Sequence, residues 1–216
     1  MGYGRRKAGL KSARNEFSQA YGAGDPDAGF FFPANCDTTL QEKDQWAYNP
    51  SVGLRTLKEL IVVYHSTVGR NCNLELDWAP FQAGPNAGSL PQEQVARFKE
   101  FGSWIKSCYG EGNRAAHTSG NTSAVTHTLV LDISGVAKPV DRLVIQEDQS
   151  YGQRILSWEV TTELGLQVAA GHSIGNKRIV VLNGTVNSSQ LVLRVLQTKA
   201  QPVIRALEAY YACPSA

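Results

Sequence analysis

The chain has 216 residues and a mass of 23.5 kDa, enough for one large or two small domains. Its formal net charge is +2, with 42% hydrophobic and 19% charged residues. This composition is typical of a soluble globular protein and excludes a disordered or collagen-like chain. No apolar run approaches the roughly eighteen residues of a transmembrane helix, so we expect no membrane span.

The positive charge is concentrated near the N-terminus. The first fourteen residues carry five basic and no acidic side chains, namely Arg5, Arg6, Lys7, Lys11 and Arg14. Such a leader can indicate nucleic-acid contact or a targeting peptide. It lacks interleaved aromatic residues and an apolar h-region. We therefore expect a solvated terminus, no nucleic-acid partner and no signal peptide in this chain.

The first half of the chain has the pattern of an α/β protein. Residues 55–67 place apolar side chains at helical spacing, which predicts a helix. Residues 72–78 alternate with period two, with apolar side chains on one side and Glu75 and Asp77 on the other, which predicts a strand. A second helix is expected to begin near Pro91 and to end at Gly110.

The second half has the pattern of an all-β domain. Residues 113–124 are rich in small and polar side chains and are interpreted as a linker. Short β-rich runs separated by turn residues follow it, at 128–133, 142–146, 155–160, 178–182, 191–196 and 203–211. The last run is also compatible with a helix. We predict an antiparallel β-sandwich over residues 125–216.

The four cysteines do not form a metal-binding pattern. Cys36, Cys72, Cys108 and Cys213 are widely spaced, and the four histidines complete no zinc-like motif. We expect no metal site and no cofactor. Buried thiols remain possible, and so do one or two disulfides in any of three full pairings.

Three acceptor motifs for N-glycosylation occur in the second half of the chain. They begin at Asn121, Asn183 and Asn187. Three such motifs within the last hundred residues favour a protein of the secretory pathway.

Two stretches contain side chains capable of catalysis. The first is residues 30–37, where an apolar run ends in Asn35, Cys36 and Asp37. The second holds Glu75 and Asp77, two carboxylates on one face of a strand. Paired carboxylates are typical of glycoside hydrolysis. The structural alternatives are that Asp37 caps a loop and that the acidic pair is neutralised by Lys or Arg. No motif links a histidine to Cys36 as a nucleophile.

Two aromatic residues follow the first of these stretches. Trp46 and Tyr48 could stack on the face of a sugar, or they could belong to the core.

Several motifs, in the same order along the chain, resemble those of the α-L-fucosidases of glycoside hydrolase family 29. Residues 24–27 and 32–40 are similar to the family's "GDPD…PAECD" segment. Residues 46–48 match its "WFY" segment, with Ala47 replacing the central aromatic residue. Residues 68–80 resemble "VGRNxxLLLNxxP", and residues 95–105 resemble the terminal helix. In the β-rich half, residues 147–154 and 173–179 are also similar to the family.

The resemblance implies a particular architecture. Residues 1–112 would be the C-terminal portion of a (β/α)8 TIM-barrel catalytic domain, and residues 125–216 a C-terminal β-sandwich. The fold class is thus α/β plus all-β. A complete barrel takes about 250 residues, so most of the barrel has no counterpart in this chain.

The resemblance also implies an activity and its residues. Family members are retaining exoglycosidases that hydrolyse terminal α-L-fucose with an aspartate nucleophile and a glutamate acid/base. No segment here matches the nucleophile strand, and Asn35 occupies the acid/base position. An amide cannot transfer a proton as a carboxyl group does. Glu42 in the next loop is a candidate substitute, and the substrate-binding candidates are Trp46, Tyr48 and Asp77.

We therefore expect the isolated chain to be inactive and to derive from a truncated fucosidase sequence. The expected partners are fucosylated glycans or glycoproteins, and the full-length parent would be secreted or lysosomal. The alternative is a non-catalytic module that binds fucose or other carbohydrates.

Overall fold

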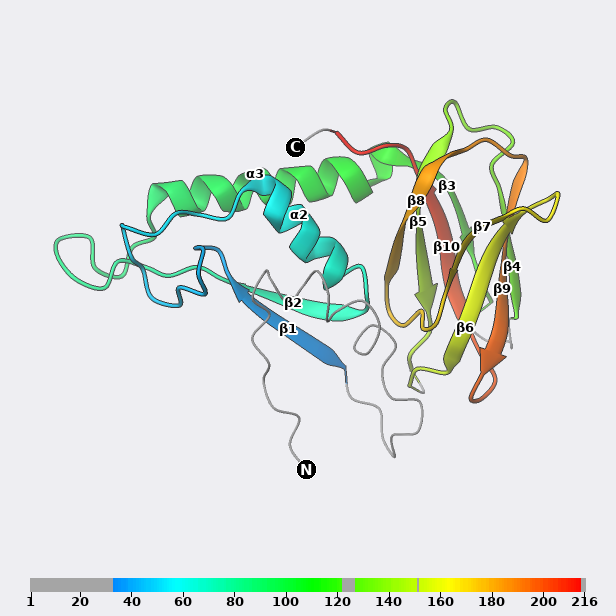
Figure 1. Cartoon of the computed structure of the whole chain (residues 1–216), viewed down its shortest axis with the longest axis horizontal. Coiled ribbons are helices and arrows are strands. Elements are labelled where there is room, and N and C mark those ends of the chain that lie inside the picture. The colour runs from blue at the N-terminus through cyan, green and yellow to red at the C-terminus, as the bar shows by residue number, and fades with distance from the viewer. Residues whose placement is uncertain (1–32, 122–126, 151, 215–216) are drawn as a thin grey trace.

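The computed structural model describes residues 33–121, 127–150 and 152–214. Two parts lie side by side in Figure 1, a parallel strand pair covered by two helices and a β-sandwich. Within the described ranges, no helix is long and apolar enough to cross a membrane.

The strand pair consists of β1 (Ala34–Thr39) and β2 (Cys72–Asp77), which run parallel. Both helices lie on one side of this pair (Figure 1). A disulfide between Cys36 and Cys72 joins the two strands. The predicted strand at 72–78 is confirmed, and parallel strands linked through a helix are the expected building block of a β/α barrel.

Both predicted helices are confirmed. Helix α2 (Leu57–Ser66) begins with a capping box, in which Thr56 and Glu59 each accept a hydrogen bond from the other's backbone N–H. Helix α3 (Gln92–Tyr109) follows Pro91 and ends at Gly110. A short 3₁₀ turn, η1 (Glu111–Asn113), connects it to the sandwich.

The sandwich contains two antiparallel four-stranded sheets. The first has the order β3-β10-β5-β8 and consists of Arg114–Ser119, Ile204–Tyr210, Val140–Glu147 and Arg178–Val186. The second has the order β4-β9-β6-β7 and consists of Thr128–Asp132, Gln190–Thr198, Ile155–Thr162 and Gln167–Gly171. The apolar core between them includes Leu143, Trp158 and Leu193. The predicted sandwich is confirmed, and the ambiguous run at 203–211 forms strand β10.

The linker predicted at 113–124 is wrong for residues 114–119. These residues form β3, which pairs with β10 along its length. Its sequence of one basic, two small and three polar residues hides the strand, because none of its side chains is a large apolar group. The sandwich therefore begins at Arg114 rather than at residue 125.

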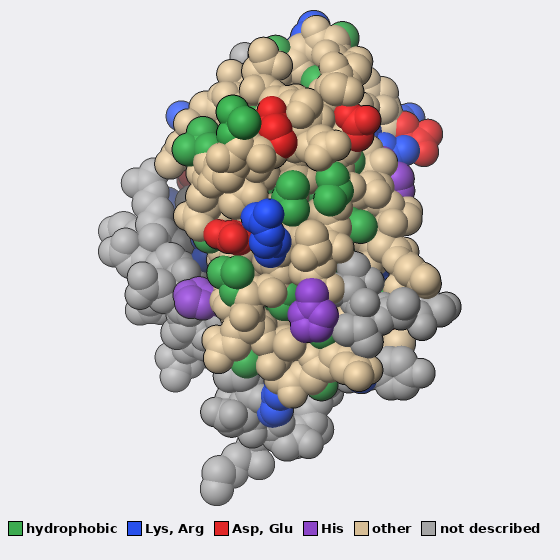
Figure 2. All heavy atoms as spheres, turned by 90° about the vertical axis from the view of Figure 1, so that its right-hand side faces the viewer, with side chains coloured by type: hydrophobic (Ala, Val, Ile, Leu, Met, Phe, Trp, Pro, Cys, Tyr) green, Lys and Arg blue, Asp and Glu red, His purple; other side chains and the backbone are tan. Residues whose placement is uncertain are grey.

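The outward face of the second sheet is chemically mixed. Exposed apolar side chains, such as Val130 and Leu196, lie among polar groups and near the ion pair of Arg194 with Glu159. Figure 2, which views this side of the molecule, shows small separate apolar areas rather than one continuous patch.

The helices and the sandwich share one apolar core. Leu60, Tyr64, Phe101 and Trp104 of the helices pack with Val144, Ile179 and Tyr210 of the first sheet. Strand β5 is therefore buried on both faces, because Leu143 and Ile145 point into the sandwich while Val144 points toward the helices.

Backbone contacts fasten the start of β2 to the sandwich. The N–H of Ile179 donates to the carbonyl of Gly69, and the N–H of Asn71 donates to the carbonyl of Lys177. The side-chain oxygen of Asn71 accepts the N–H of Asn176 at 2.6 Å. Asn71 has a φ of 65°, a left-handed conformation that asparagine tolerates better than most residues. Residues 68–71 of the "VGRN" motif thus position the strand pair against the first sheet.

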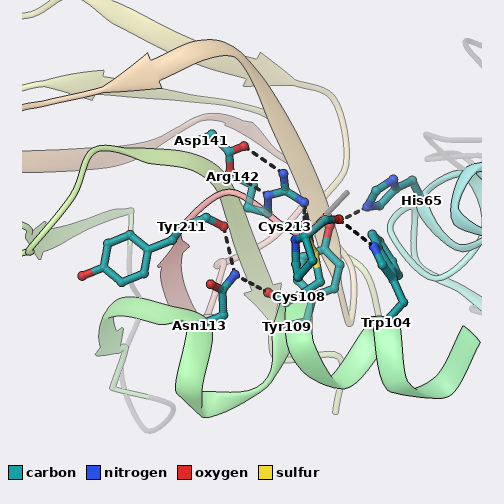
Figure 3. A network of polar contacts seen from close by, with 10 residues as sticks. His65, Trp104, Cys108, Tyr109, Asn113, Asp141, Arg142, Tyr211 and Cys213 are labelled. Atoms are coloured by element: carbon teal, nitrogen blue, oxygen red, sulfur yellow. Dashed lines mark hydrogen bonds and ion pairs between the residues drawn. A yellow bond between two sulfur atoms is a disulfide. The ribbon is translucent and has the colours of Figure 1, made fainter. Parts of the chain in front are cut away.

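A polar network closes the same junction near the C-terminus (Figure 3). A disulfide joins Cys108 to Cys213, and the amide of Asn113 donates to the carbonyls of Cys108 and Tyr211, at 2.9 Å each. Arg142 forms a bidentate ion pair with Asp141 and also contacts the cysteine sulfurs. The C-terminal segment is therefore tied to the end of helix α3.

His65 is a titratable group of this junction whose pKa the fold lowers. Its Nε2 lies 2.5 Å from the hydroxyl of Tyr109 (Figure 3). Burial, together with the charge of Arg142, lowers the pKa of His65 from 6.5 to about 4. The folded state therefore keeps this ring neutral over a range in which the unfolded chain protonates it.

We predict that the free energy of unfolding falls as the pH is lowered from 6.5 to about 4, because the unfolded state binds a proton at His65 that the folded state rejects. Urea unfolding at several pH values measures the slope. His65→Gln should flatten it, whereas His172→Gln, at an exposed position, should not. An equal slope in wild type and His65→Gln would contradict the assignment.

Candidate functional site

The strand pair presents one polar face, on the side away from the helices. In the parallel register Asn35 lies opposite Asn73, Asp37 opposite Glu75, and Thr39 opposite Asp77. Because strand side chains alternate, these six project from one face, while Cys36, Cys72 and Leu76 project toward the helices. The amide and carboxylate groups thus form a continuous row, which we call the polar row (Asn35, Asp37, Thr39, Asn73, Glu75 and Asp77).

Asn35 is hydrogen-bonded to both neighbours on β2. Its Nδ2 donates to Glu75 Oε2 at 3.1 Å, and its Oδ1 accepts from Asn73 Nδ2 at 2.9 Å. The two bonds fix the orientation of the amide, with its nitrogen directed at a carboxylate. Asn73 was missed by the sequence reasoning, although the period-two alternation that identified Glu75 and Asp77 includes it.

Asp77 lies in an acidic environment. Burial raises its pKa, and the negative charges of Glu75 and Asp37 raise it further. The expectation that Glu75 and Asp77 are neutralised by Lys or Arg is not met among the residues the structure describes, where no ion pair reaches either carboxylate and Glu75 instead accepts the amide of Asn35.

The interpretation of Asp37 as a loop cap is wrong, whereas the low expectation for Cys36 as a nucleophile agrees with the structure. Asp37 does not cap a loop, because it lies within β1 opposite Glu75. Cys36 cannot act as a nucleophile in this state, because its sulfur is bonded to that of Cys72.

The loop after β1 is held in place by two buried polar residues. The Gln41 side chain donates to the carbonyls of Asn49 and Val52, and its oxygen accepts the N–H of Asn49. Arg55 donates to the carbonyl of Thr39 at 2.7 Å and pairs with Asp44 at 3.4 Å. These contacts fold residues 41–54 into an ordered loop at the carboxyl end of β1.

This loop carries three of the predicted site residues. Glu42 is half-buried, and its backbone N–H donates to the carbonyl of Gly53. Trp46 is 37% exposed. The ring of Tyr48 packs edge-on against Phe81, and its hydroxyl donates to Glu93 at 3.1 Å, which connects the loop to the start of helix α3. The structure thus brings Asn35 and Asp77 into one row, while the sugar-binding roles of Trp46 and Tyr48 stay predictions.

The three acceptor asparagines of the glycosylation motifs belong to the β-rich half of the chain. Asn121, Asn183 and Asn187 are all exposed. Within the described ranges, no group of three or more His, Cys, Asp or Glu side chains is arranged to hold a metal ion.

The sequence and the structure of the chain were compared with those of known proteins. No model of a known protein family matches the chain. α-L-Fucosidase 1 of Arabidopsis thaliana is 24% identical over 242 residues, which cover 96% of this chain and 46% of that protein. The crystal structure of a proposed α-L-fucosidase from Bacteroides thetaiotaomicron is 27% identical, with a TM-score of 0.76 over 88% of this chain and 43% of that one.

The chain matches the C-terminal part of the α-L-fucosidase family, glycoside hydrolase family 29. A family 29 fucosidase of Ruminococcus gnavus, solved with fucose, has the same fold at 19% identity, with a TM-score of 0.69 over 88% of this chain and 43% of that one. The resemblance seen in the motifs is thereby confirmed. The chain spans less than half the length of each of these fucosidases.

We predict that Asp77→Asn raises the free energy of unfolding at pH 7. The raised pKa of Asp77 means that its ionised form is disfavoured in the folded state, so a neutral amide removes that penalty. The difference from wild type should shrink as the pH falls and Asp77 becomes protonated. Urea unfolding at pH 7 and near pH 3 measures both.

Asp132→Asn is the matched control. Hydrogen bonds from the backbone and hydroxyl of Ser134 lower the pKa of Asp132, so the same substitution there should decrease stability at pH 7. A loss of stability in Asp77→Asn at pH 7 would contradict the proposed environment.

Proposed function

We propose that this chain forms one wall of the active site of an α-L-fucosidase, an enzyme that hydrolyses terminal α-L-fucose from glycans with retention of configuration. The observation that carries the proposal is the match to the Bacteroides thetaiotaomicron fucosidase, which extends over 88% of the chain. In parallel-barrel enzymes, reactive groups lie at the carboxyl ends of strands, and Asp37, Glu75 and Asp77 lie toward those ends of β1 and β2.

The chemistry of the polar row suggests which residues would bind the sugar and which group would react with it. Carboxylates and amides bind sugar hydroxyls as paired acceptors and donors, so Asp77 and its neighbours would hold the sugar. The carboxylate nucleophile would come from another strand, because no segment of the chain matches the family's nucleophile strand. Trp46 and Tyr48, on the loop that follows β1, would contact the fucose or the leaving group to which it is attached.

The isolated 216-residue chain should not hydrolyse an aryl α-L-fucoside. No segment of the chain matches the family's nucleophile strand, so the covalent step would lack its carboxylate nucleophile. Release of the aryl group, followed by absorbance at micromolar protein, measures this. Turnover clearly above a heat-denatured control would contradict it.

The fixed amide of Asn35 also favours a second candidate function, binding of fucosylated glycans without cleavage. The row would then act through its hydrogen-bonding groups alone. Calorimetric titration of the same preparation with L-fucose distinguishes the two, because a pure binding module gives saturable heat. No heat at millimolar fucose counts against this second function.

We also propose that the protein passes through the secretory pathway. Two disulfides are typical of an oxidising compartment, and the three acceptor asparagines are exposed. Mass spectrometry of peptides containing Asn183 and Asn187, from protein made in a eukaryotic secretory host, should detect glycans. Unmodified peptides alone would contradict the proposal.

A further inference from the structure

We propose that Glu75 supplies the acid/base carboxyl group that position 35 lacks. The inference rests on the proposed fucosidase function and adds a catalytic residue to it. It starts from the contact between the Asn35 amide and the Glu75 carboxylate, whose nitrogen and oxygen lie 3.1 Å apart.

The hydrogen bonds of Asn35 locate this carboxylate relative to the missing one. Asn73 donates to Asn35 Oδ1, so the Asn35 nitrogen points toward Glu75 rather than away from it. An oxygen of Glu75 therefore lies one hydrogen-bond length from the place that the end of the position-35 side chain occupies. A carboxyl group on β2 thus lies beside the side chain of residue 35, on the same face of the strand pair.

The setting of Glu75 suits a group that must reach substrate. Its side chain is exposed, and it belongs to the polar row rather than to the apolar side that faces the helices. Glu75 lies opposite Asp37, two residues nearer the carboxyl ends of the strands than the pair formed by Asn35 and Asn73. Among the residues that the structure describes, no lysine, arginine or histidine forms an ion pair with it.

Two departures from the family pattern coincide at this contact. The motif that residues 68–80 resemble has leucine where this chain has Glu75, and the motif around residue 35 has glutamate where this chain has asparagine. An acidic group is thus lost at one position and gained at the position that touches it. An isolated loss of the catalytic acid would not place a new carboxylate there.

The chemistry of each step balances. Protonated Glu75 donates its proton to the glycosidic oxygen as the bond to the sugar breaks and a carboxylate nucleophile forms the glycosyl ester. The Glu75 carboxylate then takes a proton from the water that attacks the same carbon. Fucose is released, the nucleophile is freed, and Glu75 is protonated again.

The contact itself is tested on the isolated chain. NMR detects the side-chain amide of Asn35, whose chemical shifts should follow the titration of Glu75 and lose most of that dependence in Glu75→Gln. An Asn35 titration that is the same in Glu75→Gln would place the carboxylate elsewhere and overturn the proposal.

Catalysis is tested by joining the 216-residue chain to the part of the Bacteroides thetaiotaomicron fucosidase that lies outside the matched 43%. With wild-type sequence this fusion should hydrolyse aryl α-L-fucosides. Glu75→Gln should lower kcat/KM by about 10²- to 10⁴-fold for poor leaving groups and much less for good ones, and azide should restore part of the rate. A merely structural role would show neither the leaving-group dependence nor the azide rescue. Glu111→Gln, at an exposed carboxylate after helix α3, is the control and should leave the rate unchanged.

The outcomes separate this proposal from the proposed function. An active fusion in which Glu75→Gln has no effect overturns the role of Glu75 and keeps the fucosidase function. A fusion that is inactive as wild type and becomes active with Asn35→Glu also overturns the role of Glu75 and keeps the fucosidase function. A folded fusion that is inactive both as wild type and with Asn35→Glu overturns both.

If the fusion does not fold, the same exchange is made in the intact relative. There, asparagine at the position matching 35 should abolish turnover, and adding glutamate at the position matching 75 should restore it. Failure to restore would overturn the proposal.

Discussion

The shared apolar core between the two helices and the first sheet is the interaction on which the rest of the structure depends. Val144, Ile179 and Tyr210 of the sandwich are buried by Tyr64, Phe101 and Trp104 of the helices. Each large side chain removed from water contributes about 1.5–3 kcal/mol, so this contact is comparable with the whole stability of a typical domain. Exposure of these side chains to water, on either the helices or the sandwich, would be unfavourable by a large free energy. The contact therefore fixes the helices against the sandwich, and through them the strand pair.

The position of the polar row follows from that contact. The helices bury one face of β1 and β2, which leaves the other face for amides and carboxylates. The backbone bonds of Gly69 and Asn71 to the sandwich then hold the start of β2. Apolar packing on one side of two short strands thus positions six polar side chains on the other. The sandwich contributes to the site by this support, since the residues of the row all come from β1 and β2.

Much of this arrangement could be predicted from the sequence where periodicity is strong. Helices α2 and α3 and strand β2 have clear spacing and recognisable ends, and dispersed motifs suffice to indicate the fucosidase family. Strand β3 was missed because alanine, serine and threonine carry little pattern, although pairing with β10 stabilises it. The disulfide pairing could not be derived, because spacing along the chain says nothing about which cysteines meet in space.

The polar row could be predicted only in part, for a related reason. Alternation along β2 identifies Glu75 and Asp77, but the sequence does not specify the register between β1 and β2. That register is what places Asn35 against Glu75 and makes a lost carboxyl group and a gained one neighbours. The burial of Val144 by the helices could not be predicted either, because the sequence of β5 has the pattern of an ordinary sandwich strand and does not show what covers its outer face.

Scanning calorimetry of the isolated chain tests most directly whether the strand pair, the helices and the sandwich form one unit. The shared core predicts a single unfolding transition in which the calorimetric and van't Hoff enthalpies agree. Val144→Ala should shift that one transition to lower temperature as a whole. Two separate transitions, only one of which moves with Val144→Ala, would contradict the account.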